Sequence, residues 1–268
     1  MELNALLASP IVLPSIPKVV ALLLSELDRE VPDLKNITQL IATDPALTTR
    51  VLQTANTPLF KLSGKVHSAA EALALLDLAH IRHMAADAAS AASLKGIPGV
   101  NLPQFWAYSV NVAKLSRSLA GVTRQNQGAA FTCGLIHAIG ELVMHAGMPA
   151  EMAALNKELG PLDLKRAKAE MLRFGYNYAH VGGAYVRQWR FPQPMVDALE
   201  HQYAPFSNNV YEPLAGVIHL ATWRARAKEA KLNDKALAVT FPGEVGEVLD
   251  LDIDMVLQQD PFDWSAHT

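Results

Sequence analysis

Apolar residues recur at helical spacing along almost the whole chain, and no stretch shows the alternating pattern that is typical of a strand. Glycine or proline ends the helical runs: the run 104–121 stops at Gly121, and the run 127–147 stops at Gly147, shortly before Pro149. No repeat of fixed period appears. The sequence therefore predicts an all-α fold made of many separate helices.

One segment is richer in helix breakers than the rest. Residues 96–103, GIPGVNLP, hold two glycines and two prolines. With 268 residues, half of them hydrophobic, the chain has room for one large domain or two small lobes, and we expect the seam between two lobes at this segment. The predicted units are an N-terminal helical lobe over 1–96, a second helical lobe over 97–230, and a C-terminal helix and tail over 231–268.

Capping residues mark two helix starts. Asp44 stands at an N-cap position, and Pro45 follows at the first helical position, where a missing N–H costs nothing. Ser68 and Glu71 have capping-box spacing. Because the run that follows Ser68 is too long for an ordinary helix, we expect a break near Asp77.

The charge of the chain argues against a large nucleic-acid surface. Its formal net charge is −3 and its pI is about 6.3, so no overall positive field attracts nucleic acid or an anionic membrane. One basic cluster follows Trp223, but it alternates with alanine and Glu229, and this pattern is typical of a solvated helix face. Its members are Arg224, Arg226, Lys228 and Lys231. No nucleic-acid partner is expected.

Other features concern the cellular compartment. Cys133 is the only cysteine, which excludes an internal disulfide and fits a reducing compartment. The first residues contain Pro10, Pro14 and Pro17 and lack the positive region of a signal peptide. No apolar run reaches the roughly 20 uncharged residues of a membrane span. We therefore expect a cytoplasmic protein with no membrane partner.

Several separated segments resemble one family, in the order in which that family has them. They include DPALTTRVLQTAN at 44–56, the FW pair at 105–106, LIHAIG at 135–140 and NYAHVGGAYVRQWRFPQPMVDALEHQY at 177–203. On these segments the chain is similar to the HDOD domain family from about Leu13 to Thr222. The resemblance implies a two-lobed, all-helical HDOD fold and a role in bacterial signalling and regulation. The second lobe is then related to the HD metal-dependent phosphohydrolases.

The resemblance also implies where a metal site would lie. Active HD phosphohydrolases hold divalent metal with an upstream histidine, a consecutive His-Asp pair and a later aspartate, and the metal activates water. In this chain the upstream histidine falls at or near Tyr108, the pair falls on His137 and Ala138, and the later aspartate falls on Thr222. A further histidine common in relatives falls near Tyr178. The histidines retained from secondary positions are His201 and His219. Since one clear ligand cannot hold a catalytic ion against water, we expect no metal, no cofactor and no catalytic residue.

His137 has a structural and a functional interpretation. The favoured one is a buried, hydrogen-bonded histidine, with Glu141, four residues away on the same helix face, as a candidate partner. Cys133 lies four residues away in the other direction, but a thiolate nucleophile would need a third, orienting group that the sequence does not show. The alternative is a tyrosine-walled cleft for a small organic ligand. The residues proposed for it are Tyr108, His137, Tyr178, His201 and His219. The surrounding aromatic residues, which fit core packing better, are Phe105, Trp106, Tyr176 and Trp189.

Two other histidine positions need an interpretation. His80, His83 and Asp87 share one helix face and could in principle bind zinc or nickel, but a solvated or packed face is the better explanation. His145 stands near the end of its helix, where it would interact favourably with the helix dipole.

Two functions of different class remain. The favoured one is a non-catalytic HDOD-type regulatory module that binds a signalling protein or a small ligand. The alternative is a divergent metal-dependent phosphohydrolase acting on a nucleotide or phosphodiester. The carboxylates missing at Ala138 and Thr222 argue against the alternative, and the sequence leaves the oligomeric state open.

Overall fold

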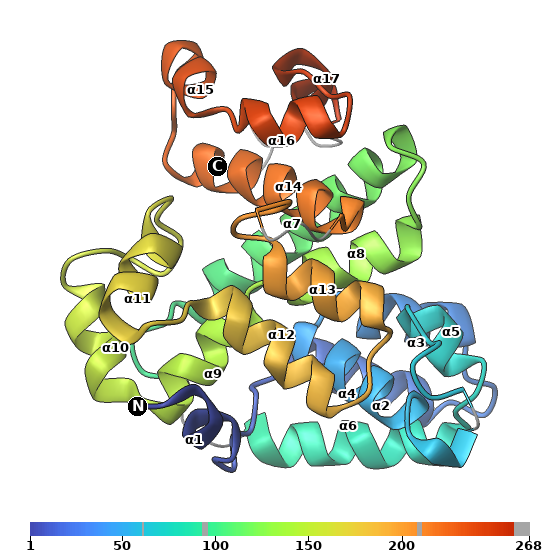
Figure 1. The fold of residues 1–268 in the computed structure, drawn as a ribbon. Helices are drawn as coiled ribbons and strands as arrows, with labels where there is room; N and C mark the ends of the chain where they lie inside the picture. Colours follow the sequence, from blue (N-terminus) through green and yellow to red (C-terminus); the bar gives the residue numbers. More distant parts are fainter. Residues whose placement is uncertain (61, 93–95, 208–210, 260–268) are drawn as a thin grey trace.

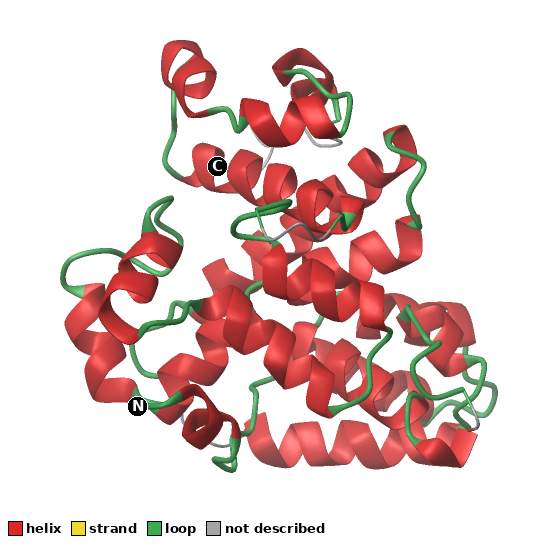
Figure 2. Ribbon diagram, in the orientation of Figure 1, coloured by secondary structure: helices red, strands yellow, loops and turns green. Residues whose placement is uncertain are grey.

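The computed structural model describes residues 1–60, 62–92, 96–207 and 211–259. In these ranges every regular element is helical, and no strand occurs, as the apolar periodicity predicts (Figures 1 and 2). The first part of the chain contains α1 (Leu3–Leu7), α2 (Pro17–Leu27), α3 (Leu34–Ile41), α4 (Pro45–Ala55), the 3-10 turn η1 (Pro58–Phe60), α5 (Ala69–Leu73) and α6 (Leu78–Ala92).

The second part begins within the breaker-rich segment 96–103, whose last two residues open α7. It contains α7 (Leu102–Val122), α8 (Gln127–Ile136), α9 (Ile139–Gly147), α10 (Pro149–Asn156), α11 (Arg166–Phe174), α12 (Tyr178–Gln188), α13 (Gln193–His201) and α14 (Pro213–Glu229). The C-terminal segment contains α15 (Asp234–Thr240), α16 (Gly243–Val248) and α17 (Ile253–Gln258). Three short helices thus stand where the sequence suggested one, and residues 260–268 of the expected tail lie outside the described residues.

The helices are arranged around α7. Helix α7 packs along α8 and α14, while α12 packs against α9 and α13. Helices α2 to α6 gather at one end of the molecule, and α15 to α17 lie beyond α14 at the other (Figure 1). The first helix, α1, packs mainly on α9 and α12 of the second part of the chain.

The predicted helix starts in the first part of the chain are confirmed. Asp44 caps α4: one carboxylate oxygen accepts from Leu47 N at 2.9 Å, and the other accepts from Ile16 N at 2.5 Å. Ser68 caps α5 by accepting from Glu71 N at 3.2 Å. Helix α5 ends at Leu73 and α6 begins at Leu78, so the chain breaks near Asp77 as expected.

The apolar run 127–147 differs from its prediction, because it is two helices instead of one. Helix α8 ends at Ile136 and α9 begins at Ile139, with Ala138 in a non-helical conformation (φ −102°, ψ 17°). The carbonyl oxygen of His137 accepts from the side-chain Nε2 of Gln202 at 2.9 Å, so a residue distant in sequence satisfies this carbonyl at the break. The run is long and apolar enough to cross a membrane by composition, but 89% of its most apolar window is buried inside the protein. It is a core segment.

Gly140 lets α9 approach α12 closely. A Cβ built on this residue would lie 2.0 Å from the carbonyl oxygen of Tyr178 and 2.8 Å from the amide nitrogen of Gly182. Only glycine fits such an approach between two backbones. This contact places the first turn of α12, and with it Tyr178, beside the break at His137.

Candidate functional site

Four side chains from separate elements of the second part of the chain meet in the core of the protein. Tyr108 comes from α7, His137 from the break between α8 and α9, Tyr178 from the start of α12, and Arg226 from α14. They are 1%, 0%, 2% and 4% exposed, respectively. The tyrosine-walled cleft considered from the sequence is therefore closed in this structure, and Arg226 contacts both tyrosines. We refer to these four residues as the Arg226 cluster.

Hydrogen bonds fix the proton positions within the cluster. His137 Nδ1 lies 2.7 Å from the carbonyl oxygen of Gly134, which can only accept, so Nδ1 carries the ring proton. Nε2 then has the lone pair, and it lies 3.1 Å from the hydroxyl of Tyr108, which donates to it. The same Tyr108 oxygen accepts from Nε of Arg226 at 3.1 Å. His137 is thus a neutral imidazole whose only lone pair is engaged by a tyrosine.

Arg226 also makes two contacts outside this chain of bonds. One terminal nitrogen, NH1, donates to the carbonyl oxygen of Asp163 at 3.0 Å. The guanidinium carbon lies 5.2 Å from the centroid of the Tyr178 ring, which is cation–π geometry. The interpretation of the basic segment as a solvated helix face is therefore wrong for Arg226. Basic residues of this segment lie on different faces of α14: Arg224 and Lys228 are partly exposed, whereas Arg226 is covered by the two tyrosines.

Burial shifts the pKa values of the cluster. Burial lowers the pKa of His137 to about 3; the Gly134 carbonyl opposes this shift, and the charge of Arg226 adds to it. Burial also raises the pKa of Tyr108 and of Tyr178. Burial opposes the charge of Arg226, but the neighbouring Tyr178 and Tyr108 oxygens outweigh it and raise its pKa above the ordinary value. At neutral pH the cluster therefore carries one positive charge, on Arg226.

A second buried network lies next to the cluster. Arg166 Nε is 3.2 Å from Glu141 Oε1 and 2.7 Å from Glu170 Oε1, and all three side chains are at most 1% exposed. The other Glu170 oxygen accepts from the amide of Tyr178 at 2.8 Å, which ties this network to the cluster. Burial, followed by the Glu141 carboxylate, raises the pKa of Glu170. Arg166 contacts both carboxylates, and Glu141 also interacts electrostatically with Arg226.

These contacts correct two expectations. Glu141 pairs with Arg166, and its backbone oxygen accepts from His145 Nδ1 at 2.8 Å, so Glu141 is not the partner of His137. His145 is fully buried and its Nε2 lies 3.1 Å from Asn156 Nδ2. Burial lowers the pKa of His145, so it acts as a neutral, hydrogen-bonded core residue and not as a charge at the end of α9.

His219 lies beside the cluster and touches it through Gln202. His219 Nδ1 donates to the backbone oxygen of Gln202 at 2.7 Å, and the Gln202 side chain donates to His137 O. His219 therefore supports the break at His137 indirectly.

Thr222, one turn before Arg226 on α14, has a buried hydroxyl with no hydrogen-bond partner among the described residues.

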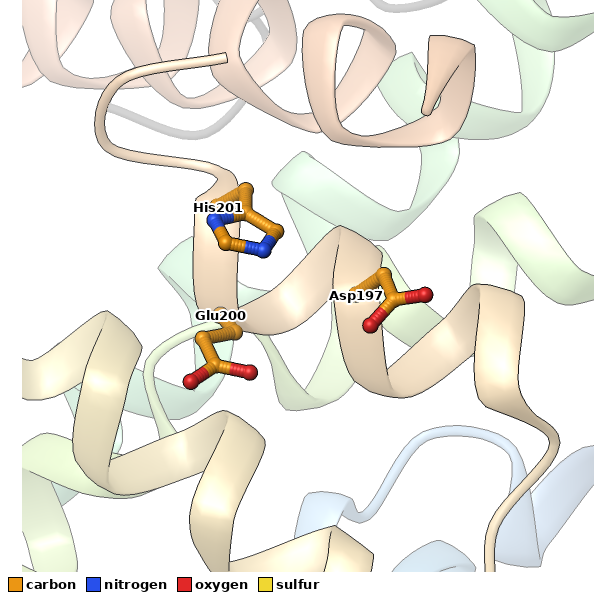
Figure 3. Close-up of side chains that lie close together, drawn as sticks. All are labelled: Asp197, Glu200 and His201. Atoms are coloured by element: carbon orange, nitrogen blue, oxygen red, sulfur yellow. The ribbon is translucent and has the colours of Figure 1, made fainter. Parts of the chain in front are cut away.

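His201 lies in a different environment, on the half-exposed face of α13 (Figure 3). Potential ligand atoms of Asp197, Glu200 and His201 lie within 4.8 Å of one another. Two of these groups already have protein partners: Glu200 pairs with Arg187, and Asp197 accepts from Gln193 Nε2 at 2.7 Å. The structure thus places four of the five candidate residues in or beside the cluster and His201 apart from them.

The remaining candidates are also placed. Cys133 is fully buried, and burial raises the pKa of its thiol. His80 pairs with Asp77 at 2.7 Å and His83 pairs with Asp87 at 3.1 Å, all with exposed side chains, so the histidines on this face belong to two separate surface pairs. Among the aromatic residues, Phe105 and Tyr176 are buried, whereas Trp189 is 44% exposed.

A comparison with protein families matches residues 13–205 to the HDOD domain. The chain belongs to the HDOD family. The match spans most of both lobes, from the segment before α2 to the turn after α13, and it confirms the resemblance found in the sequence.

The relatives and similar structures are distant in sequence. An uncharacterized protein of Treponema pallidum (strain Nichols) is 23% identical over 202 residues, which are 74% of this chain and 39% of that protein. The crystal structure of the MmoQ response regulator from Methylococcus capsulatus str. Bath is 23% identical with a TM-score of 0.74, covering 93% of this chain and 98% of that one. A putative phosphohydrolase from Shewanella amazonensis SB2B is 26% identical with a TM-score of 0.51, covering 92% and 90%. These structures share the HDOD fold with this chain.

Proposed function

We propose that this HDOD protein is a non-catalytic regulatory module of the cytoplasm, which binds a signalling protein or a small ligand. The observation that carries the proposal is the Arg226 guanidinium, buried between Tyr108 and Tyr178 in the region where the family resemblance places the HD metal site. One of the structurally similar proteins is described as a response regulator, which supports a signalling role.

The residues of the cluster do not fit a divalent metal. A metal of this kind needs several convergent imidazole or carboxylate donors. The only imidazole of the cluster has its lone pair engaged by the Tyr108 hydroxyl, and the positions expected to supply carboxylates hold Ala138 and Thr222. A fixed positive charge on Arg226 would further repel a cation placed there.

Arg226 explains how the lobe can keep its fold without a metal. It lies one helical turn after Thr222, on the same face of α14. Its charge interacts favourably with the buried Glu141 carboxylate beside the cluster, and its donors satisfy the Tyr108 hydroxyl and the Asp163 carbonyl. Arg226 thus takes over the stabilising role that a metal would have in this region, but it cannot activate a water molecule as a metal does.

A hydrolysis assay tests the proposal against the phosphohydrolase alternative. Purified protein is incubated with bis(p-nitrophenyl) phosphate and with a cyclic dinucleotide, each in the presence of Mn²⁺ or Mg²⁺. We expect no turnover above that of His137→Ala protein, because the cluster offers no site for a metal-bound water. Turnover that requires metal and is abolished in His137→Ala would establish the alternative instead.

The binding role is tested separately by capture of partners. Tagged protein is used as bait in lysate of its native host, with and without a metal chelator. A regulatory module that works without metal should recover the same signalling protein, such as a receptor or a kinase, under both conditions. Recovery only without the chelator would argue for a metal-dependent function.

A further inference from the structure

A cavity of about 620 Å³ lies between the two parts of the protein. Helices α3, α4 and α5 of the first part line it on one side, and α7 and α8 of the second part line it on the other. In Figure 1, α3 and α5 lie on the same side of the molecule as α8. No residue of α14 and no member of the Arg226 cluster is among those that line the cavity. The volume falls within the range of small-molecule sites, roughly 300–1,000 Å³.

Polar groups without protein partners line this cavity. Thr132 on α8 is 2% exposed, and its hydroxyl makes no hydrogen bond with any described residue. A helical threonine commonly bonds a carbonyl of the preceding turn, so an unpaired hydroxyl at a cavity wall is available to a ligand. Arg117 on α7 lines the cavity and makes no ion pair or hydrogen bond within the described part of the chain. The side-chain amides of Gln39 and Gln127 on opposite walls are equally available.

The charge and shape of the wall indicate the kind of ligand. Arg117 is the only charged residue among those that line the cavity, and no carboxylate is among them. Arginine binds carboxylate and phosphate oxygens through two parallel hydrogen bonds. The ring of Phe131 and the small side chains of Ala42 and Ala69 add apolar surface, against which a flat group can pack.

We propose that this interlobe cavity binds a small organic anion with one carboxylate or phosphodiester charge, hydroxyl or amide groups, and a flat apolar ring. The anion pairs with Arg117, a polar group bonds the Thr132 hydroxyl, and the ring packs on Phe131. Such a ligand contacts both lobes at once and stabilises their contact between α3–α5 and α7–α8. A regulatory role for this ligand rests on the proposed function, whereas binding of the ligand to the cavity can be tested independently of it.

Calorimetric titration with matched probes tests the site. The two anions are 4-hydroxybenzoate, a carboxylate, and cyclic AMP, a phosphodiester; their uncharged counterparts are 4-hydroxybenzamide and adenosine. We expect one of the anions to bind in a saturable way and its uncharged counterpart to bind about tenfold more weakly, the size of one charged hydrogen-bond contact. The anion that binds distinguishes a carboxylate ligand from a phosphodiester.

Variants locate the binding. Arg117→Gln should weaken the anion about tenfold, and Thr132→Val several-fold, while Arg173→Gln on α11, remote from the cavity, leaves binding unchanged. Arg117 is exposed, so its variant should keep the thermal unfolding midpoint of the wild type. Failure of both anions to bind, or binding that Arg117→Gln leaves intact, would overturn the site. Metal-dependent hydrolysis would overturn the proposed function and leave the site standing.

Discussion

Two hydrogen bonds hold the His137 ring in its neutral form, one donated by Nδ1 and one accepted by Nε2. The free energy of unfolding should therefore depend on pH. The folded pKa of His137, about 3, lies below the ordinary value of 6.5, so unfolding takes up a proton between these two pH values. The free energy of unfolding should therefore fall as the pH falls from about 6 to about 4, by roughly 1.4 kcal/mol per pH unit from this residue.

His145 and His219 also have lowered pKa values and add to the pH dependence of stability. The part due to His137 is therefore obtained by comparing the wild type with a variant that lacks this ring. Urea unfolding of the wild type and of His137→Gln at several pH values should give a shallower slope for the variant in this window and no difference in slope above about pH 7. Equal slopes, or a ring ¹⁵N spectrum that shows a charged His137 at pH 5, would contradict a neutral buried histidine.

Arg226 should matter for stability far more than an exposed arginine. Arg226→Met keeps most of the side-chain volume but removes the bonds to the Tyr108 hydroxyl and the Asp163 carbonyl and the positive charge near the buried Glu141 carboxylate. We expect a loss of about 3 kcal/mol in the free energy of unfolding. The matched control is Arg173→Met, which breaks only a surface pair with Glu158 and should cost less than about 1 kcal/mol. Similar small losses for both variants would show that the cluster contributes no stability.

At the level of helices, the approach of α9 to α12 depends on one missing side chain. Gly140→Ala would place a methyl group 2.0 Å from the Tyr178 carbonyl oxygen, so the two backbones must separate. We expect a loss of about 3 kcal/mol, measured by denaturant unfolding. Gly160→Ala is the control, because a Cβ there has open space and the change should stay within about 0.5 kcal/mol. A mild effect of Gly140→Ala would mean that the helices do not approach so closely.

Asp44 joins two elements in addition to capping one. Its second carboxylate oxygen accepts from Ile16 N, just before α2, whereas the carboxylate of the N-cap Asp33 accepts only from the first turn of α3 among the described residues. Asp44→Ala should therefore cost about 2 kcal/mol and Asp33→Ala about 1 kcal/mol. Thermal unfolding of the two variants measures the difference, and equal losses would contradict the link between Asp44 and the segment before α2.

Local signals explain why the helix pattern could be predicted and the site could not. Proline, glycine and capping residues such as Asp44 act within one turn, so helix starts can be inferred from neighbours in sequence. The break at His137 depends on Gln202, and the burial of Arg226 depends on Tyr108, which is 118 residues away. A basic run interleaved with alanine has the same pattern whether its arginine faces solvent or two tyrosines. The family resemblance located Tyr108, His137 and Tyr178, but it gave no indication of Arg226.

For the molecule as a whole, our main proposal is that an arginine occupies the region where the family resemblance places the HD metal site. The most direct measurement is the metal content of protein purified without chelator and dialysed against Mn²⁺ and Zn²⁺, determined by elemental analysis. We expect far less than one equivalent of metal, and the same content in His137→Ala. Stoichiometric metal that disappears in His137→Ala would contradict it, because the lone pair of His137 would then bind an ion and not the Tyr108 hydroxyl.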